Sequence, residues 1–202
     1  MIAVIDYGAG NLFSVANALD YLDLPYRITD KTEEIRSAEG IILPGVGAFA
    51  PAMELLREKG FDTLLREEAK RKPLLGICLG MQMLFEKSYE FGAHEGLGLL
   101  RGEVVPFPET VSIVPHMGWN KLEKKNDCPL MAGLSADTYV YFVHSYKANG
   151  AAEDLAAVCD YEGVEVPALV YDGGFVYGAQ FHPEKSGDAG LQMLRNFGGL
   201  LK

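Results

Sequence analysis

The sequence has few cysteines, and they form no recognisable pairing. Cys78, Cys128 and Cys159 are an odd number, and none belongs to a Cys-x-x-Cys pair. Disulfide frameworks use even numbers of cysteines, and zinc sites usually draw on closely spaced pairs. We therefore expect no disulfide framework, no metal site and a reducing, cytoplasmic location.

Positive charge and long apolar runs are also scarce. The 202 residues contain 18 Lys and Arg against 28 Asp and Glu, a net charge of -10. Nucleic-acid backbones and anionic membranes repel a surface of this sign, so neither is an expected partner. No apolar run approaches the roughly 18 residues that a membrane helix needs, and the first apolar residues, 2–5, lack the basic leader of a signal peptide.

The composition that remains is that of a folded globular protein. Hydrophobic residues make up 49% and charged residues 23% of the chain, and the sequence contains no fixed-period repeat and no low-complexity segment. A chain of this length suits one domain with a sizeable core. We expect a single domain over residues 1–202.

Short apolar runs alternate with helical patterns in the first half of the chain. Strands are expected at 2–5, 25–28 and 40–43 and from Pro73 onward, and segments with helical spacing separate them. This order requires a parallel sheet with right-handed crossovers and helices on both faces.

Strand patterns follow one another in the second half, separated by turn-forming pairs. They lie at 102–107, 118–122, 138–143, 155–159, 168–171 and 175–181. A helix is expected after Ser186. The predicted fold class is α/β: a mixed, mainly parallel central sheet flanked by helices, with a smaller antiparallel sheet in the C-terminal half.

A Gly-x-Cys-x-Gly turn is centred on Cys78. An apolar run that reads as a buried strand precedes it, and the spacing of Met81, Leu84 and Phe85 after it predicts a helix. Such a strand-to-helix turn resembles a nucleophile elbow, in which flanking glycines let neighbouring backbone pass close to a strained, exposed nucleophile. The alternative is a small buried thiol at a tight packing point.

A cysteine nucleophile that attacks a carbonyl needs a base, and His182 is the strongest candidate. An extended chain over residues 180–184 would put His182 and Glu184 on one side, so that the carboxylate could orient the imidazole. Of the other histidines, His94 lies in a glycine-rich loop and is expected to face solvent. His116 and His144 are more readily explained as hydrogen-bonded structural histidines.

Attack on a carbonyl also creates an oxyanion that needs rigid N–H donors. The N–H of Leu79 follows the nucleophile, and the strand end that contains Val46 and Gly47 could supply a second donor. A peptide flanked by glycines can rotate at small steric cost, so this segment could act as a gate.

Six segments together resemble a known family. They are residues 7–12, 44–49, 76–82, 115–120, 141–146 and 180–186. Across essentially the whole chain the sequence is similar to class I (triad) glutamine amidotransferases, and more narrowly to the glutaminase subunits of imidazole glycerol phosphate synthase. The segments Pro-Gly-Val-Gly at 44–47 and His-Met-Gly-Trp-Asn at 116–120 point to the narrower group; Pro106, where relatives often carry a basic residue, departs from its pattern.

The resemblance implies hydrolysis of L-glutamine to glutamate and ammonia through a γ-glutamyl thioester on Cys78. It implies that no cofactor is needed. It also implies that Gln82 binds the α-amino acid end of the substrate, assisted by Ser145, Tyr146 and the backbone at Gly47.

The resemblance further implies a heterodimer with a (β/α)8-barrel cyclase. Ammonia would pass through an internal channel to the cyclase, which makes imidazole glycerol phosphate and an aminoimidazole carboxamide ribonucleotide in histidine biosynthesis. Low activity of the isolated chain, and activation by the liganded partner, are expected. The docking residues implied by the resemblance are Asn11, Met117, Trp119, Tyr141 and Lys185.

Three other functions fit parts of the sequence. The glutaminase of pyridoxal phosphate synthase shares the chemistry but is not expected to carry the segments at 44–47 and 117–120. A non-catalytic module that docks on a barrel protein would not need Cys78, His182 and Glu184. A cysteine hydrolase or chaperone-like elbow protein would not need Gln82.

Overall fold

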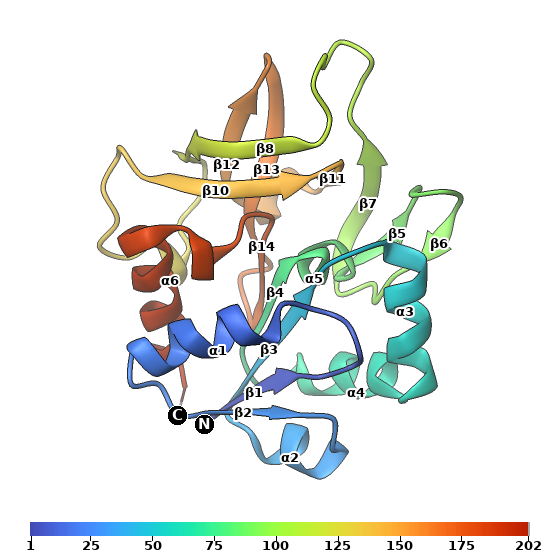
Figure 1. The fold of residues 1–202 in the computed structure, drawn as a ribbon, viewed down its shortest axis with the longest axis vertical. Helices are drawn as coiled ribbons and strands as arrows, with labels where there is room; N and C mark the ends of the chain where they lie inside the picture. Colours follow the sequence, from blue (N-terminus) through green and yellow to red (C-terminus); the bar gives the residue numbers. More distant parts are fainter. Residues whose placement is uncertain (202) are drawn as a thin grey trace.

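The computed structural model describes residues 1–201 as an α/β fold around one eight-stranded sheet (Figure 1). In spatial order its strands are β2 (Tyr26–Thr29), β1 (Ile2–Ile5), β3 (Gly40–Gly45), β4 (Leu74–Cys78), β14 (Val176–Ala179), β13 (Val164–Tyr171), β12 (Leu155–Tyr161) and β9 (Glu123–Lys124). Neighbours from β2 to β14 pair in parallel, and the pairs from β14 to β9 are antiparallel. The mainly parallel central sheet predicted from the sequence is confirmed.

Helices cover both faces of this sheet because its central strands are apolar on both sides. In β1, Ile2 and Val4 join the cluster under α1 (Leu12–Tyr21) and α6 (Gly187–Gly199), while Ala3 and Ile5 join the opposite cluster. That second cluster is covered by α2 (Thr32–Ser37), α3 (Phe49–Glu58) and α4 (Phe61–Glu68). The α6 helix closes the first cluster, as expected.

Two small sheets stand where one was expected. One is the antiparallel pair β8 (His116–Lys121) and β10 (Tyr139–His144). The other, in spatial order, contains β11 (Tyr146–Gly150), β7 (Leu100–Pro106), β5 (Phe85–Ser88) and β6 (His94–Glu95). In this second sheet β5 and β7 pair in parallel. Short 3-10 turns complete the chain: η1 (Pro129–Met131), η2 (Ala152–Asp154) and η3 (Pro183–Lys185).

The helix predicted after Cys78 is much shorter than its apolar spacing suggested. It is a single turn, α5 (Leu79–Gln82), and Phe85 already begins β5. The residues from Leu79 to Phe85 are all buried, so the segment has no polar face. Without such a face, hydrophobic periodicity does not distinguish a helix from a strand.

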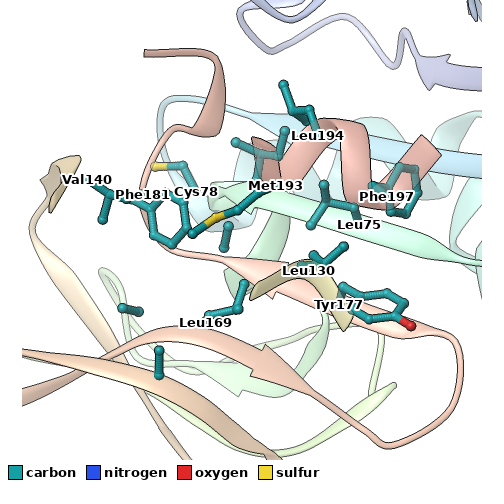
Figure 2. Close-up of a cluster of buried hydrophobic side chains, with 14 of the residues drawn as sticks. Leu75, Cys78, Leu130, Val140, Leu169, Tyr177, Phe181, Met193, Leu194 and Phe197 are labelled. Carbon is teal, nitrogen blue, oxygen red and sulfur yellow. The ribbon is translucent and has the colours of Figure 1, made fainter. Parts of the chain in front are cut away.

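The sheet brings the middle and the end of the chain together. Because β14 pairs in parallel with β4, the segment after β14 lies at the same end of the sheet as Cys78. Cys78 belongs to the same buried cluster as Leu75, Phe181 and Met193 (Figure 2). Within residues 1–201, no helix is long and apolar enough to cross a bilayer.

Candidate active site

Cys78 occupies a strained turn between β4 and α5. Its backbone has φ 54° and ψ -111°, a region that side-chain-bearing residues rarely adopt. A β-carbon on Gly76 would lie 2.6 Å from the carbonyl oxygen of Gly80, and one on Gly80 would collide with the carbonyl oxygen of Leu43. The Gly-x-Cys-x-Gly spacing is therefore a steric requirement of this turn, which joins a strand to a helix as the sequence predicted.

His182 and Glu184 form a buried pair beyond the end of β14. His182 Nδ1 lies 2.8 Å from Glu184 Oε1, and the two side chains are 3% and 1% exposed. The extended chain predicted over residues 180–184 is wrong: β14 ends at Ala179, and the 3-10 turn η3 begins at Pro183. That turn, rather than strand alternation, brings the carboxylate back to the imidazole.

The surroundings of His182 favour its protonated form. Burial lowers the pKa of the ring, but the side-chain interactions with Cys78 and Glu184 outweigh burial and raise the pKa to about 9. The imidazole thus lies between a sulfur and a carboxylate, as general acid–base catalysis at a thiol requires.

A cavity of about 410 Å³ opens at the sulfur. The predicted site residues that line it are Val46, Gly47, Cys78, Gln82, Ser145, Tyr146 and His182. Its volume falls within the range of small-molecule sites. The structure therefore gathers the predicted nucleophile, base and substrate-binding residues around one space.

Gln82 is held in a fixed orientation at the base of this cavity. Its Nε2 donates to the carbonyl oxygen of Tyr146 and to Oε1 of Gln180, both at 3.0 Å. Gln180 Nε2 in turn lies 3.9 Å from Cys78 Sγ. Since the amide protons of Gln82 are used within the protein, its Oε1 is the atom left to accept from a ligand.

The predicted oxyanion donors either adjoin Cys78 in the chain or line the same cavity. Leu79 directly follows Cys78, and Val46 and Gly47 line the cavity at the end of β3, whose Gly45 is the register partner of Cys78. Gly47 has φ +94° and no atom within 4 Å of a β-carbon position, so its peptide has room to turn.

Glu90 is a cavity residue that the sequence analysis missed. It follows β5, lines the same cavity, and its Oε2 accepts a 2.6 Å hydrogen bond from the backbone N–H of Phe49. The sequence pattern predicted a helix through Phe85, whereas Phe85 begins the strand β5, which leads to Glu90. Its only sequence signal is a carboxylate in a loop beyond a buried strand, which is too common to single it out.

The predicted docking residues lie on four elements: β8, β10, η3 and the start of α1. Met117 and Trp119 on β8 are 60% and 55% exposed. The Trp119 ring packs edge-on against Tyr141 of β10, with centroids 6.0 Å apart. The remaining two are Asn11, which caps α1 through Ser14, and Lys185, which is exposed in η3. Contacts of η3 with both α1 and β10 make these elements neighbours.

The three cysteines form no disulfide, and the described part of the chain offers no metal-binding cluster. Cys78, Cys128 and Cys159 are all buried and unpaired. Over residues 1–201, no group of three or more His, Cys, Asp or Glu side chains could hold a metal ion.

Comparisons with known proteins agree on a family. The family described as "Glutamine amidotransferase class-I" matches residues 3–199. Imidazole glycerol phosphate synthase subunit HisH of Bacillus anthracis (strain CDC 684 / NRRL 3495) is 51% identical over 207 aligned residues, covering 100% of this chain and 96% of the relative. The HisH subunit of Bacillus cereus (strain G9842) is also 51% identical, with the same coverage of both chains.

Solved structures share the fold at low identity. A glutamine amidotransferase crystal structure is 22% identical with a TM-score of 0.75, over 98% of this chain and 100% of that one. The structure of PurLQS from Thermotoga maritima is 23% identical with a TM-score of 0.73, over 100% of this chain and 98% of that one. The chain therefore belongs to the class-I glutamine amidotransferase family and, within it, to the HisH subunits of imidazole glycerol phosphate synthase.

Proposed function

We propose that this chain hydrolyses L-glutamine with Cys78 as nucleophile, His182 as acid and base, and Glu184 as the group that orients His182. The observation that carries the proposal is the strained turn that presents Cys78 to a cavity shared with a His182–Glu184 pair. A structural thiol would need neither the strain nor the pair. The continuous eight-stranded sheet supports one domain over the chain, because β14 from the second half pairs with β4 from the first.

Catalysis proceeds in two halves. The Cys78 thiolate attacks the side-chain amide carbon of glutamine, and the N–H of Leu79, with the peptide at Val46 and Gly47, stabilises the oxyanion. The His182 imidazolium then gives its proton to the leaving nitrogen, so that ammonia departs and a γ-glutamyl thioester remains. Neutral His182 takes a proton from water, the hydroxide attacks the thioester, and glutamate is released as the Cys78 thiolate and the His182 imidazolium are restored.

Substrate recognition follows from the charges around the cavity. The free Oε1 of Gln82 and the carboxylate of Glu90 are acceptors suited to the α-ammonium group of glutamine. Ser145, Tyr146 and Gly47 line the same cavity, and their polar groups are suited to the α-carboxylate end. Recognition of both charged ends would exclude amides that are not amino acids.

The product has to reach a second active site. Ammonia becomes protonated in neutral water and is then no longer a nucleophile, so a glutaminase gains from delivering it directly to an acceptor. The partner we propose is a (β/α)8-barrel cyclase subunit in a heterodimer, docked on Asn11, Met117, Trp119, Tyr141 and Lys185. Exposed Met117 and Trp119 support this surface, because exposed aromatic and Met side chains are enriched at interfaces. Three unpaired cysteines fit a cytoplasmic enzyme.

The segment at residues 44–47 is the proposed gate of the oxyanion hole. Gly45 is tightly enclosed, since a β-carbon there would lie 2.6 Å from the backbone nitrogen of Gly80. Gly47 is open, and Val46 between them is 43% exposed. A peptide anchored on one side and free on the other can rotate when a docked partner favours one orientation.

The test is glutamate formation by the chain together with the cyclase and its ribonucleotide ligand. Cys78→Ala should lower the rate by about 10⁴-fold or more, because the covalent route is lost. Cys128→Ala, at another buried free cysteine, is the matched control and should keep its activity. A Cys78→Ala chain as active as the parent would reject the proposal.

A further inference from the structure

Two buried histidines pair at the cavity, where His144 belongs to the lining and His116 does not. His116 on β8 and His144 on β10 face each other as register partners and are 0% and 6% exposed. His116 Nδ1 lies 2.9 Å from His144 Nε2, so one proton must lie between the two rings. The proposed hydrolysis uses neither ring.

The outer nitrogens of the pair both face acceptors. His144 Nδ1 lies 2.7 Å from the carbonyl oxygen of Tyr146, which can only accept. His116 Nε2 lies 2.8 Å from Oδ1 of Asn120. The orientation of Asn120 is set by its Nδ2, which donates at 3.0 Å to the carbonyl oxygen of Asp160. Each outer nitrogen must therefore carry a proton.

The count is three protons on four ring nitrogens, one more than two neutral imidazoles hold. We infer that His116 and His144 form a buried imidazolium–imidazole pair at neutral pH, and that they position Tyr146 and Gln82 at the glutamine cavity.

The charge belongs on His116. Its ring is stacked between Tyr161, with centroids 3.9 Å apart, and Phe142, at 4.6 Å, and aromatic faces stabilise a cation. The pKa of His144, in contrast, is lowered first by burial and then further by the neighbouring rings of His116 and His182. A charge on His116 is thus held by aromatic rings and kept away from the protonated base.

Burial opposes this charge. Desolvation lowers the pKa of His116, and it lowers that of His144 to about 3. Neutral rings, however, would require Asn120 to turn its amide. The Asn120 and Asp160 oxygens would then face each other at 3.0 Å.

Four other ionisable groups lie near the pair. Tyr161 stacks on His116, and its hydroxyl donates to the Ile113 carbonyl. Cys78, Glu90 and His182 line the cavity together with His144.

A series of hydrogen bonds, in which the Tyr146 carbonyl is a shared acceptor, connects the pair to the nucleophile. The Tyr146 carbonyl accepts from both His144 and Gln82, Gln82 donates to Gln180, and Gln180 donates toward Cys78. Loss of the His116 proton would free the His144 ring to turn and would release the carbonyl that fixes Gln82. This consequence for catalysis rests on the proposed glutamine hydrolysis.

Nitrogen-15 NMR of the full chain, labelled at the histidine rings, tests the proton count directly. At neutral pH we expect an imidazolium ring, with both nitrogens protonated, that persists in His182→Gln and disappears in His116→Phe. Two neutral rings for His116 and His144 would overturn the inference. This readout needs no glutaminase activity, so it stands even if the proposed function fails.

Kinetics of the complex with the cyclase test the positioning role. His116→Phe keeps the aromatic stack and should raise KM for glutamine about tenfold, with a smaller change in kcat. His94→Phe, outside the cavity, is the control and should leave both constants unchanged. An unchanged KM in a folded His116→Phe chain, checked by its near-UV circular dichroism, would overturn the positioning role.

Discussion

A buried carboxylate lies at each end of the central strands of the sheet, and the two carboxylates have different partners. At the amino ends of β3, β4 and β14, Glu68 is fully buried beside a hollow lined by Arg36, Arg71 and Lys72. At the carboxyl ends of the same three strands, Glu184 is 1% exposed beside the cavity residues Cys78 and His182.

The partners of the two carboxylates differ in number and kind. Glu68 Oε1 accepts from Arg36 and Arg71, and Oε2 accepts from Arg71 and pairs with Lys72 at 2.8 Å. Lys72 also donates to three carbonyls, of Ile35, Arg36 and Ala38. Glu184, in contrast, has one partner, His182, and within residues 1–201 its Oε2 has none.

The difference between the two carboxylates separates structure from function. A carboxylate whose lone pairs are all met by permanent cations contributes to folding, and removing it leaves those cations uncompensated. A carboxylate paired only with a ring that gains and loses a proton can serve a reaction. A substitution of Glu184 should therefore affect mainly activity, and a substitution of Glu68 should affect mainly stability.

Glu184→Gln should lower glutamate formation by about 10³-fold. A neutral amide can still accept from Nδ1, but it does not stabilise the imidazolium that forms during catalysis. The melting temperature should fall less than in Glu68→Gln, because His182 can lose its proton when its partner is neutral. The measurement is kcat of the complex with the cyclase, with Asp188→Asn in the first turn of α6 as control. Full activity in Glu184→Gln would contradict the assignment of a catalytic role to Glu184 and a structural role to Glu68.

Glu68→Gln should show the opposite behaviour. Loss of the buried charge should destabilise the chain by about 3 kcal/mol, or roughly 6–12 °C in melting temperature, with kcat unchanged. The neighbouring Glu67, which is 51% exposed, provides the matched control, and Glu67→Gln should cost less than about 1 kcal/mol. Equal effects of the two changes would contradict the structural role of Glu68.

Gly47→Ala should reduce the stimulation of glutaminase activity by the liganded cyclase about tenfold. A β-carbon meets no atom there, so the change acts only through the φ of +94°, which alanine resists. Gly163→Ala is the matched control, because Gly163 has φ +78°, an equally open surrounding and a place in the distant β12–β13 turn. Stimulation that survives in Gly47→Ala would reject the gate.

Stability should depend on pH through His182. Its pKa is raised from 6.5 to about 9, so the folded chain binds this proton more tightly than the unfolded chain. The contribution is fully present below pH 6.5 and is lost as the pH rises toward 9. Between pH 6.5 and pH 9 the melting temperature of the parent should fall more than that of His182→Asn. Parallel curves of melting temperature against pH would contradict the pKa assigned to His182.

Local rules made much of the site predictable from the sequence. Cys78 stood out because its two glycines satisfy a steric need that the structure makes explicit at Gly80. His182 and Glu184 stood out by their spacing, although a 3-10 turn and not a strand joins them. These residues are close in sequence, so their geometry depends on few unknowns.

The rest depends on contacts between distant segments. Glu90 reaches the cavity only because β5 follows α5 at once, and a wholly buried run cannot reveal that change of element. The division of the small sheet in two depends on which strands pair, and strand alternation does not specify partners. The His116–His144 contact likewise follows from the β8–β10 register.

The most direct test of the proposed mechanism is to trap the covalent intermediate. The complex with the cyclase and its ligand would be mixed with glutamine, quenched in acid and analysed by peptide mass spectrometry. We expect a γ-glutamyl group on the peptide that contains Cys78, and no such group in Cys78→Ala. Glutamate release without any adduct on Cys78, and with Cys78→Ala equally active, would contradict the mechanism.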